Sequence, residues 1–284
     1  MARVAISLSK GPLAQNMNSP AAIEFQNVWL YFDEKPALSD VSFRVERGET
    51  LILLGATGSG KSVILKLALG LLKADEGKVF VEGCDLGPLP EREMRDIRQR
   101  MGIVFQEGAL FDSLSVYENV AYRLREQGMK DETEMERRAR EVLSFVELEA
   151  AIEKMPAELS GGMKRRVSIA RAIVNDPHIM LYDSPTGGLD PVTAQTINIL
   201  ILKLRDVQGV SSIVVTHRLQ DAFWLAKFEY SKDTAGLVPI SSNGASGPKS
   251  STRFLVLREG SIYFLGTPSE VVSTRDPYLQ RFLR

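Results

Sequence analysis

A glycine-rich segment of the chain has the residue types and spacing that bind the phosphates of a nucleotide. Residues 55–62 read GATGSGKS, a complete G-x-x-x-x-G-K-[ST] phosphate-binding loop. In such a loop backbone N–H groups surround an anion, while Lys61 reaches the β- and γ-phosphates and the Ser62 hydroxyl ligates Mg²⁺. The candidate nucleotide-binding residues are those of the loop and of the helix start that follows: Gly55, Ala56, Thr57, Gly58, Ser59, Gly60, Lys61, Ser62 and Val63.

The loop lies where its mechanism requires, between a short strand and a helix. Residues 51–54 (LILL) form an apolar run suited to a buried parallel strand, and residues 62–69 (SVILKLAL) have the composition of a helix packed on a sheet. The alternative is a chance glycine-rich turn that contains a lysine. The complete pattern and its strand-to-helix setting disfavour this alternative and predict a nucleoside triphosphate site.

Bulk composition excludes several classes of protein. The 284 residues suffice for one large α/β domain with an inserted subdomain or for two small domains, and 35 basic against 36 acidic residues give a net charge of −1. Without a basic excess, nucleic acid is not the expected partner. Cys84 is the only cysteine, so no intrachain disulfide can form.

No apolar run approaches the roughly 18–20 residues that span a bilayer, and residues 1–20 lack the features of a signal peptide. We expect a cytosolic protein without direct membrane insertion, which reaches a membrane only through a partner.

Hydrophobic patterning predicts an α/β fold with a mostly parallel sheet. The pattern turns helical from about residue 107 to 170, where Ser115 and Glu118 form a capping-box signature, and it returns to strands afterwards. A charged helix is expected near residues 91–100. The expected strands cover residues 23–30, 38–45, 51–54, 78–81, 102–105, 179–182 and 212–215.

The boundaries of the chain follow from changes in composition. Residues 1–20 read as a flexible tail, and residues 21–284 as one domain. Residues 231–252 lack apolar periodicity and are rich in Ser and Gly, so we expect a mobile surface loop there. The remainder, residues 253–284, reads as a hairpin followed by a helix that starts after the N-cap Thr267.

Three later segments carry further polar residues suited to a phosphate site. Ser160, Gly161 and Gly162 open a predicted helix, and their hydroxyl and N–H groups suit a γ-phosphate, although Ser160 alone could be a plain N-cap. Asp183 follows the apolar strand 179–182. Asp190 precedes Pro191 and could equally be only a helix cap, and His217 alone would more often be structural. His178, the other histidine, precedes a buried strand and is interpreted as structural.

Taken in order, these motifs resemble those of ATP-binding-cassette (ABC) ATPases over residues 23–284. The resemblance implies a P-loop ABC core with an N-terminal antiparallel β subdomain and an inserted helical subdomain. It also implies ATP and Mg²⁺ as cofactors. The resemblance also implies roles for single residues. Asp183 would be the Mg²⁺ carboxylate, and Gln106 the Mg²⁺-sensing glutamine that faces a membrane subunit. Asp190 would lie in the D-loop, His217 would contact the γ-phosphate, Ser160–Gly162 would be the signature motif, and Phe32, with Tyr31 as the fallback, would stack on adenine.

The same resemblance implies partners. ABC ATPases dimerise head-to-tail and sandwich two Mg-ATP between the phosphate loop of one copy and the signature residues of the other. Their closure drives a separate membrane permease, which would place this chain at the inner face of the cytoplasmic membrane. Residues 105–120 (FQEGALFDSLSVYENV), Met163 after the signature glycines, and the terminal Asp276–Leu283 are similar to the ATPase of Mla/Mce-type lipid transporters. Methionine and phosphate importers share parts of this pattern but usually carry Gln in place of Met.

One residue departs from the family pattern. The family places Glu directly after the Walker B aspartate, whereas this chain has Ser184 after Asp183. A positioned general base typically contributes about 10²–10⁴-fold, and a serine hydroxyl can orient water but accepts its proton poorly. The alternatives are slow hydrolysis that uses His217, a substitute base elsewhere, a nucleotide-gated clamp that scarcely turns over, or a substitution that traps the ATP state. The intact remaining motifs favour a modest ATPase.

A role in DNA repair or translation is disfavoured because there is one cassette without a long coiled coil or a basic arm.

Overall fold

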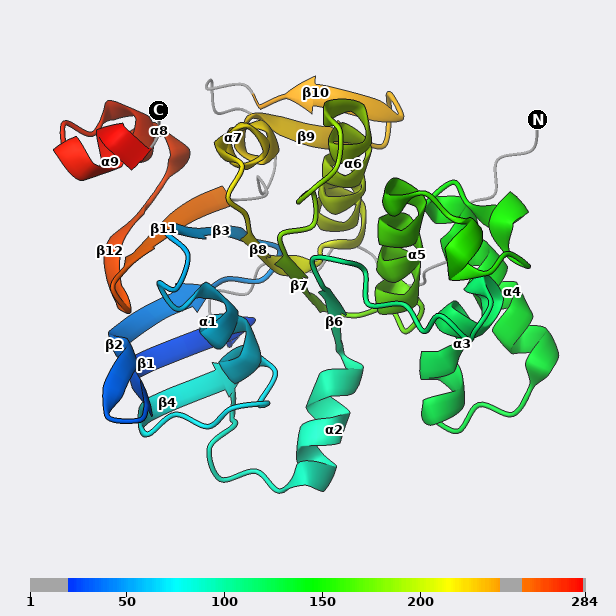
Figure 1. Ribbon diagram of the computed structural model, residues 1–284, viewed down its shortest axis with the longest axis horizontal. Coiled ribbons are helices and arrows are strands. Elements are labelled where there is room, and N and C mark those ends of the chain that lie inside the picture. Colours follow the sequence, from blue (N-terminus) through cyan, green and yellow to red (C-terminus); the bar gives the residue numbers. More distant parts are fainter. Residues whose placement is uncertain (1–19, 241–251, 283–284) are drawn as a thin grey trace.

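The computed structural model describes residues 20–240 and 252–282, so residues 1–19 of the expected tail, residues 241–251 of the expected loop and Leu283 lie outside the described residues. Two sheets organise this part of the chain (Figure 1). The larger has six strands in the order β12-β11-β3-β8-β7-β6, and the smaller has four in the order β2-β1-β4-β5. A two-stranded sheet is formed by β9 and β10.

The six-stranded sheet is built around β3 (Thr50–Gly55), which pairs in parallel with β8 (Ser211–Val215) and β11 (Thr252–Arg258). Next come β7 (Ile179–Asp183) and β6 (Met101–Val104), also parallel. The edge strand β12 (Ser261–Gly266) is antiparallel to β11. The mostly parallel sheet predicted from the sequence is confirmed.

Both faces of this sheet are covered, which explains the unbroken apolar run in β3. Ile52 and Leu54 belong to a core shared with helices α5 (Gly161–Ile173) and α6 (Pro191–Gln208). Their neighbours Leu51 and Leu53 belong to a second core, shared with α1 (Lys61–Ala68) and the smaller sheet. Figure 1 shows α6 and α7 (Leu219–Lys227) above the sheet and α1 below it. A strand buried on both faces reads as a continuous apolar segment because neither side meets water.

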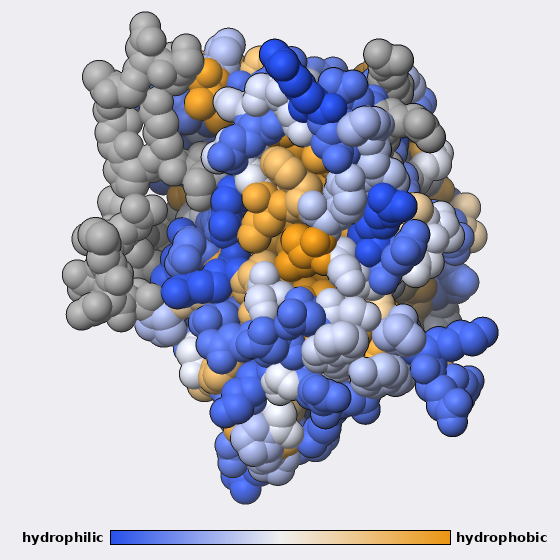
Figure 2. Space-filling view, turned by 90° about the vertical axis from the view of Figure 1, so that its left-hand side faces the viewer, coloured by the Kyte–Doolittle hydropathy of each residue, from blue (hydrophilic) through white to orange (hydrophobic). Residues whose placement is uncertain are grey.

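The smaller sheet is antiparallel, as the family resemblance implied. Strand β1 (Ile23–Phe32) pairs with β2 (Lys35–Val45) on one side and with β4 (Glu76–Val81) on the other. The short β5 (Cys84–Asp85) completes it. The side of the molecule on which β12 and β2 lie in Figure 1 carries one apolar patch surrounded by polar side chains (Figure 2).

Between β6 and β7 the chain is helical. Helices α3 (Val116–Glu126) and α4 (Glu132–Phe145) precede α5, and α2 (Glu91–Gln99) lies before β6. The predicted capping box is present: the Ser115 Oγ accepts from the Glu118 N–H at 3.2 Å, and the Ser115 N–H donates to the Glu118 carboxylate at 2.7 Å. Two 3₁₀ turns, Glu149–Ala151 and Pro156–Glu158, link α4 to α5.

The region predicted as the loop 231–252 differs from that prediction where it is described. Gly236–Pro239 form β10, which pairs with β9 (Phe228–Ser231). This hairpin is fixed to α6: the Arg205 guanidinium donates to the Phe228 carbonyl at 3.0 Å, and the Asp206 carboxylate accepts from the Tyr230 N–H at 2.6 Å. The prediction of a loop is therefore wrong for residues 236–239, because their anchors lie on a distant helix and leave no local pattern.

The C-terminal part contains two short helices in place of the single one expected. Thr267 caps α8 (Pro268–Ser273) with its side chain, as predicted, and α9 (Pro277–Phe282) follows after a break. None of the helices in residues 20–240 and 252–282 combines the length and apolar character needed to cross a membrane.

Candidate nucleotide-binding site

The phosphate-binding loop connects β3 to α1 at the carboxyl end of the central strand. Gly60 caps α1 with φ +103°, and a Cβ there would lie 2.7 Å from Leu38 Cδ2 and 2.9 Å from the Ala37 carbonyl oxygen. At Gly55 a Cβ would lie 2.5 Å from the Ser59 Oγ. These two positions exclude larger residues, because Gly60 lies against β2 and Gly55 lies against the Leu257 carbonyl, 2.6 Å from the place of a Cβ.

Lys61 is the first residue of α1 and is nearly buried. Its ammonium donates to the Gly55 carbonyl at 2.8 Å and to the Ala56 carbonyl at 2.7 Å. Burial lowers the pKa of Lys61, and the nearby Asp183 carboxylate opposes that shift. The cation therefore lies inside the loop that surrounds it, held over the carbonyl groups at its start.

Asp183 ends β7 beside the start of α1. The Ser62 hydroxyl donates to the Asp183 Oδ2 at 3.3 Å. A hydroxyl and a carboxylate side by side are the hard oxygen ligands that Mg²⁺ prefers, and this ion usually takes only one or two protein carboxylates beside phosphate oxygens. In the described residues no group of three His, Cys, Asp or Glu side chains could hold a metal by itself.

His217 follows the neighbouring strand β8 and faces the same site. Desolvation lowers its pKa, the Lys61 charge lowers it further, and the Asp183 charge opposes both. Three residues that the sequence predicted for one site therefore meet at the carboxyl ends of β3, β7 and β8. Loops at this edge of parallel strands are where α/β folds bind ligands.

Ser184 begins a tight loop that ends at Asp190. Ser184 is 7% exposed and has φ +50°, a left-handed conformation that non-glycine residues rarely adopt. Its N–H donates to the Val215 carbonyl at 2.9 Å, and its carbonyl accepts from the Gly187 N–H at 3.0 Å. At the other end the Asp190 carboxylate accepts from the N–H groups of Val192 and Thr193, both at 3.0 Å, which makes Asp190 the N-cap of α6.

The signature residues lie apart from the phosphate loop within one chain. The Ser160 Oγ accepts from the Met163 N–H at 3.3 Å, so Ser160 is the N-cap of α5. Gly161 is exposed, whereas a Cβ at Gly162 would lie 2.3 Å from Thr193 Cγ2, so the helix start packs closely on α6. Figure 1 shows β7 and β6 between α1 and α5.

The other predicted residues lie at the margins of the site. Gln106 is exposed just after β6, and a Cβ at Gly187 would lie 3.7 Å from its Cγ. Among the described residues, no hydrogen bond joins Gln106 to Ser62 or Asp183.

The remaining predicted residues lie on other elements. Phe32 and Tyr31 end β1 with 49% and 38% of their surface exposed. Val63 packs against the core beneath α1. The second histidine, His178, bonds Glu82 at 2.8 Å through Nδ1.

Two arginines that sequence reasoning missed hold the loop 184–190. Arg165, on α5, donates to the Phe105 carbonyl at 2.6 Å and to the Gly187 carbonyl at 3.3 Å. Arg218, directly after His217, donates to the carbonyls of Thr186 and Leu189, both at 3.2 Å. No periodicity or motif reveals such contacts, because each guanidinium reaches carbonyls more than 20 residues away along the chain.

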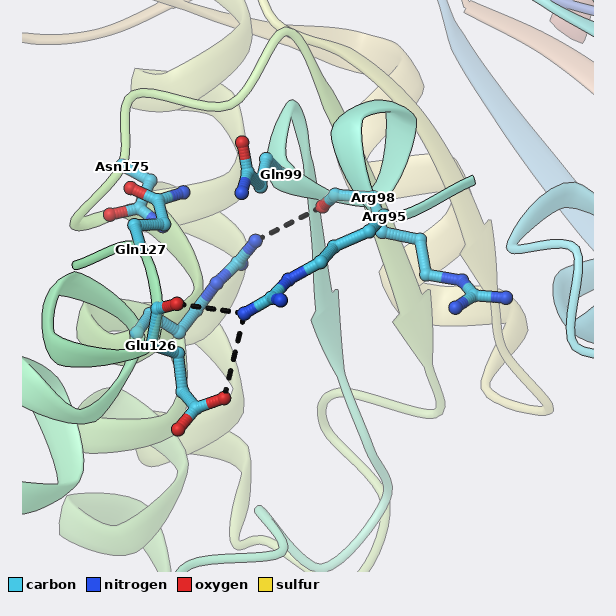
Figure 3. A pocket seen from close by; sticks show the side chains of 7 residues that line it. Arg95, Arg98, Gln99, Glu126, Gln127 and Asn175 are labelled. Atoms are coloured by element: carbon cyan, nitrogen blue, oxygen red, sulfur yellow. Dashed lines mark hydrogen bonds and ion pairs between the residues drawn. The ribbon is translucent and has the colours of Figure 1, made fainter. Parts of the chain in front are cut away.

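A separate polar cavity of about 140 Å³ lies between α2, α3 and the turn before β7 (Figure 3). Its arginines are engaged with the backbone at the ends of helices. Arg98 donates to the Leu69 carbonyl at 2.8 Å, Arg123 to the Ala172 carbonyl at 3.2 Å, and Arg95 to the Glu126 carbonyl at 2.8 Å. A cation at a helix C-terminus is stabilised by the partial charge there, so this cluster fastens helices together and is distinct from the nucleotide site.

The ABC transporter family matches residues 38–187, more than half of the chain. The chain belongs to the ABC transporter family. Its cassette is an ABC ATPase domain, whose cofactors are ATP and Mg²⁺.

Relatives of this ABC cassette carry several names. This chain is 38% identical over 201 residues to a probable ribonucleotide transport ATP-binding protein, mkl, of Mycobacterium leprae. The match covers 71% of this chain but only 58% of that protein. The chain is 35% identical over 208 residues to the intermembrane phospholipid transport ATP-binding protein MlaF of Haemophilus influenzae, covering 73% and 79%. Proteins named for sulfate/thiosulfate import in Agrobacterium fabrum and methionine import in Rhizobium meliloti match at 33% and 41% identity.

A solved structure agrees with the fold of this ABC cassette. A dimeric post-hydrolysis state of the ATP-binding cassette MJ0796, bound to ADP and Pi, superposes with a TM-score of 0.71 at 30% identity. The match covers 86% of this chain and 98% of that one. The predicted fold class is confirmed, including the antiparallel subdomain and the mostly parallel sheet.

Proposed function

We propose that this chain is the ATP-hydrolysing subunit of a transporter that moves phospholipid or another hydrophobic molecule. The observation that carries most weight is the meeting of Lys61, Asp183 and His217 around one glycine-rich loop. The chain would act as a head-to-tail homodimer, with residues 160–162 of one copy over the phosphate loop of the other. It would bind a membrane permease and lie at the inner face of the cytoplasmic membrane.

In this proposal each residue of the site has a defined task. The N–H groups of residues 55–62 and the Lys61 ammonium hold the phosphates, and Ser62 and Asp183 hold Mg²⁺ with Gln106. Bound Mg²⁺ neutralises charge that develops on the phosphates. Phe32, with Tyr31 as the fallback, stacks on the base. The partner's copy of the signature helix supplies N–H groups and a hydroxyl, which fits the exposure of Ser160 and Gly161 and their separation from the phosphate loop within one chain.

Hydrolysis is proposed to be modest because Ser184 lacks a carboxylate. His217 would accept the hydrogen bond from the attacking water in its place, because burial and the Lys61 charge lower its pKa and so favour the uncharged ring. Asp190 contributes from the D-loop. The serine at position 184 also supports a second candidate function, a nucleotide-gated clamp that closes on ATP and hardly turns over.

The lipid substrate is supported by the similarity to MlaF together with the Mla/Mce-like segment 105–120 and Met163. Other matching relatives are named for the import of sulfate/thiosulfate and of methionine, so these are the substrates that compete with phospholipid. ATP-dependent transfer of labelled phospholipid by the chain reconstituted with its permease in vesicles tests this choice. Transfer of methionine or sulfate in place of phospholipid would refute it.

The ATPase assignment is tested by Lys61→Ala, with Lys66→Ala as a matched control. Lys66 lies on the same helix but is exposed, so its loss should change neither ATP binding nor turnover. Lys61→Ala should abolish turnover and weaken ATP binding, with a modest decrease in melting temperature because two hydrogen bonds to carbonyls are lost. Undiminished ATP affinity and turnover in the folded Lys61→Ala variant would overturn the assignment. A wild-type chain that binds ATP without turnover would favour the clamp.

A further inference from the structure

Arg218 connects the two loops that flank the reacting end of the site. Its position directly follows His217, and its backbone N–H donates to the Thr216 Oγ1 at 3.0 Å, which fixes the turn after β8. Its guanidinium crosses to the other loop and donates to the carbonyls of Thr186 and Leu189, both at 3.2 Å. One side chain therefore spans from the turn that carries His217 to the loop that runs from Ser184 to Asp190.

Asp221 holds this arginine and the loop together. It lies in the first turn of α7 and is 7% exposed. Its carboxylate ion-pairs with the Arg218 Nε at 3.3 Å, accepts from the Thr186 hydroxyl at 2.6 Å, and accepts from the Asn198 amide at 3.1 Å. A nearly buried carboxylate with three partners has one favoured geometry, because loss of any partner leaves buried charge poorly satisfied.

The simplest alternative is that these contacts only stabilise a turn. A turn could be closed by its own backbone, and the loop has such a bond, from the Gly187 N–H to the Ser184 carbonyl. Arg218 adds bonds on both sides of Gly187, whose own carbonyl is held by Arg165 from the signature helix. The carbonyls of Thr186, Gly187 and Leu189 are thus all held by side chains from other elements, so the loop follows the positions of those elements.

We infer that Arg218 and Asp221 form a latch that positions the loop 184–190 against His217 for ATP hydrolysis. This inference rests on the proposed function and adds two positioning residues to it. Neither residue touches the nucleotide in this role. Their effect is to make the loop with Ser184 and Asp190 move together with His217, so that all three adopt the reactive arrangement at once. With no carboxylate at position 184, turnover should depend strongly on how well the remaining groups are aligned.

The test compares four variants with a control in the full-length chain. Arg218→Ala removes the latch. Arg218→Lys keeps the positive charge, but a lysine ammonium lacks the planar guanidinium that reaches two carbonyls and a carboxylate at once. Thr186→Val removes the hydroxyl that bonds Asp221, and Thr186→Ser restores it. Arg138→Ala is the control, because Arg138 is similarly exposed and also bonds a carbonyl, that of Val174, and a carboxylate, that of Glu134, away from the site.

We expect kcat for ATP hydrolysis to decrease about tenfold or more in Arg218→Ala, Arg218→Lys and Thr186→Val, while KM for ATP changes less than about twofold because the phosphate loop is untouched. Thr186→Ser should recover most of the wild-type kcat, and Arg138→Ala should equal wild type. Hydrogen exchange of the amides in residues 186–190 should accelerate in Arg218→Ala, with the amides of α1 unchanged.

Several results would overturn the latch. One is a kcat within twofold of wild type in folded Arg218→Lys and Thr186→Val. Another is a Thr186→Ser variant as slow as Thr186→Val, and a third is unchanged amide exchange of residues 186–190 in Arg218→Ala. If Arg218→Ala does not fold, Arg218→Lys and the Thr186 pair decide. A wild-type chain without measurable turnover would contradict the proposed function, and hydrogen exchange would then still decide whether the latch holds the loop.

Discussion

The hydroxyl of Ser62 lies 3.3 Å from a carboxylate oxygen of Asp183, although 121 residues separate them in the sequence. One is at the start of α1 and the other at the end of β7. The two groups are within hydrogen-bonding distance in the fold itself, so a divalent ion that binds between them meets ligands already in place. Little conformational change should be needed to form the metal site.

Asp183→Asn should therefore weaken Mg-ATP binding far more than metal-free ATP binding. The expected loss for Mg-ATP is roughly tenfold or more, since removing an interaction with a charged group costs about 1.5–3 kcal/mol. Calorimetric titration of ATP with and without Mg²⁺ measures the difference. Asp233→Asn, an exposed aspartate in the β9–β10 turn, is the control. An equal loss with and without Mg²⁺ would argue against a metal role for Asp183.

Gly161→Asp should prevent ATP-induced dimerisation without unfolding the chain. A Cβ at Gly161 meets only Leu189 Cδ2 at 3.7 Å, an ordinary contact, and an aspartate in the first turn of a helix interacts favourably with its dipole. The added carboxylate would face the γ-phosphate of the other copy. Light scattering with ATP and Mg²⁺ measures dimer formation, and Gly161→Asn is the uncharged control. Normal dimers in Gly161→Asp would show that the motif serves only as a helix start.

Ser184→Glu should raise the single-turnover rate of ATP hydrolysis by about ten- to a hundredfold, through the general base that the site lacks. The backbone at residue 184 already has φ +50°, so the exchange introduces no new turn geometry. Ser184→Gln, equal in size but not basic, is the control and should stay slow. Rapid-quench measurement of phosphate release decides. A rate that is unchanged or lower would show that repulsion from Asp183 outweighs the added base, or that His217 already serves.

The pKa of His217 should respond to both neighbouring charges in opposite directions. Desolvation and the Lys61 charge lower it, so Lys61→Met should raise the pKa and Asp183→Asn should lower it further. Proton NMR of the two histidines measures this, with His178→Gln assigning the signals and exposed Lys66→Met as the control. No response to Lys61→Met would show that the two side chains are not electrostatic neighbours.

The same shift has a consequence for stability. In the unfolded chain a histidine takes up its proton near pH 6.5, while the folded chain resists protonation of His217. The unfolded state therefore binds more protons as the pH decreases through about 6.5, so this residue makes the fold less stable at lower pH. In Lys61→Met that contribution to the pH dependence should become smaller.

The sequence predicted the parts of this protein that depend on local pattern. The apolar run of β3, the capping box at Ser115 and the helix start after Thr267 each form as expected, because each is decided within a few residues. The nucleotide-site motifs were recognisable because phosphate binding demands a fixed order of glycines, lysine and serine. Their convergence followed from parallel strands, whose carboxyl ends share an edge.

What escaped prediction depends on contacts between distant segments. Strand β10 exists because Arg205 and Asp206 on α6 hold its partner strand. Arg165 and Arg218 reach carbonyl groups on other elements, and a carbonyl carries no side-chain identity that a sequence could reveal. The role predicted for the signature residues, on the nucleotide of a second copy, stays a prediction.

The central strand of the six-stranded sheet pairs on both sides with strands that lie far from it in the sequence. Strand β3 ends at Gly55, yet it pairs with β8, which ends at Val215, and with β11, which begins at Thr252. The phosphate loop is therefore synthesised well before the two strands that support its base. Contacts of such long sequence separation form slowly, because the intervening chain must first be ordered. A chain truncated before Thr252 would carry the complete loop sequence and β8 but would lack β11, so it should bind nucleotide more weakly than the chain that contains both strands.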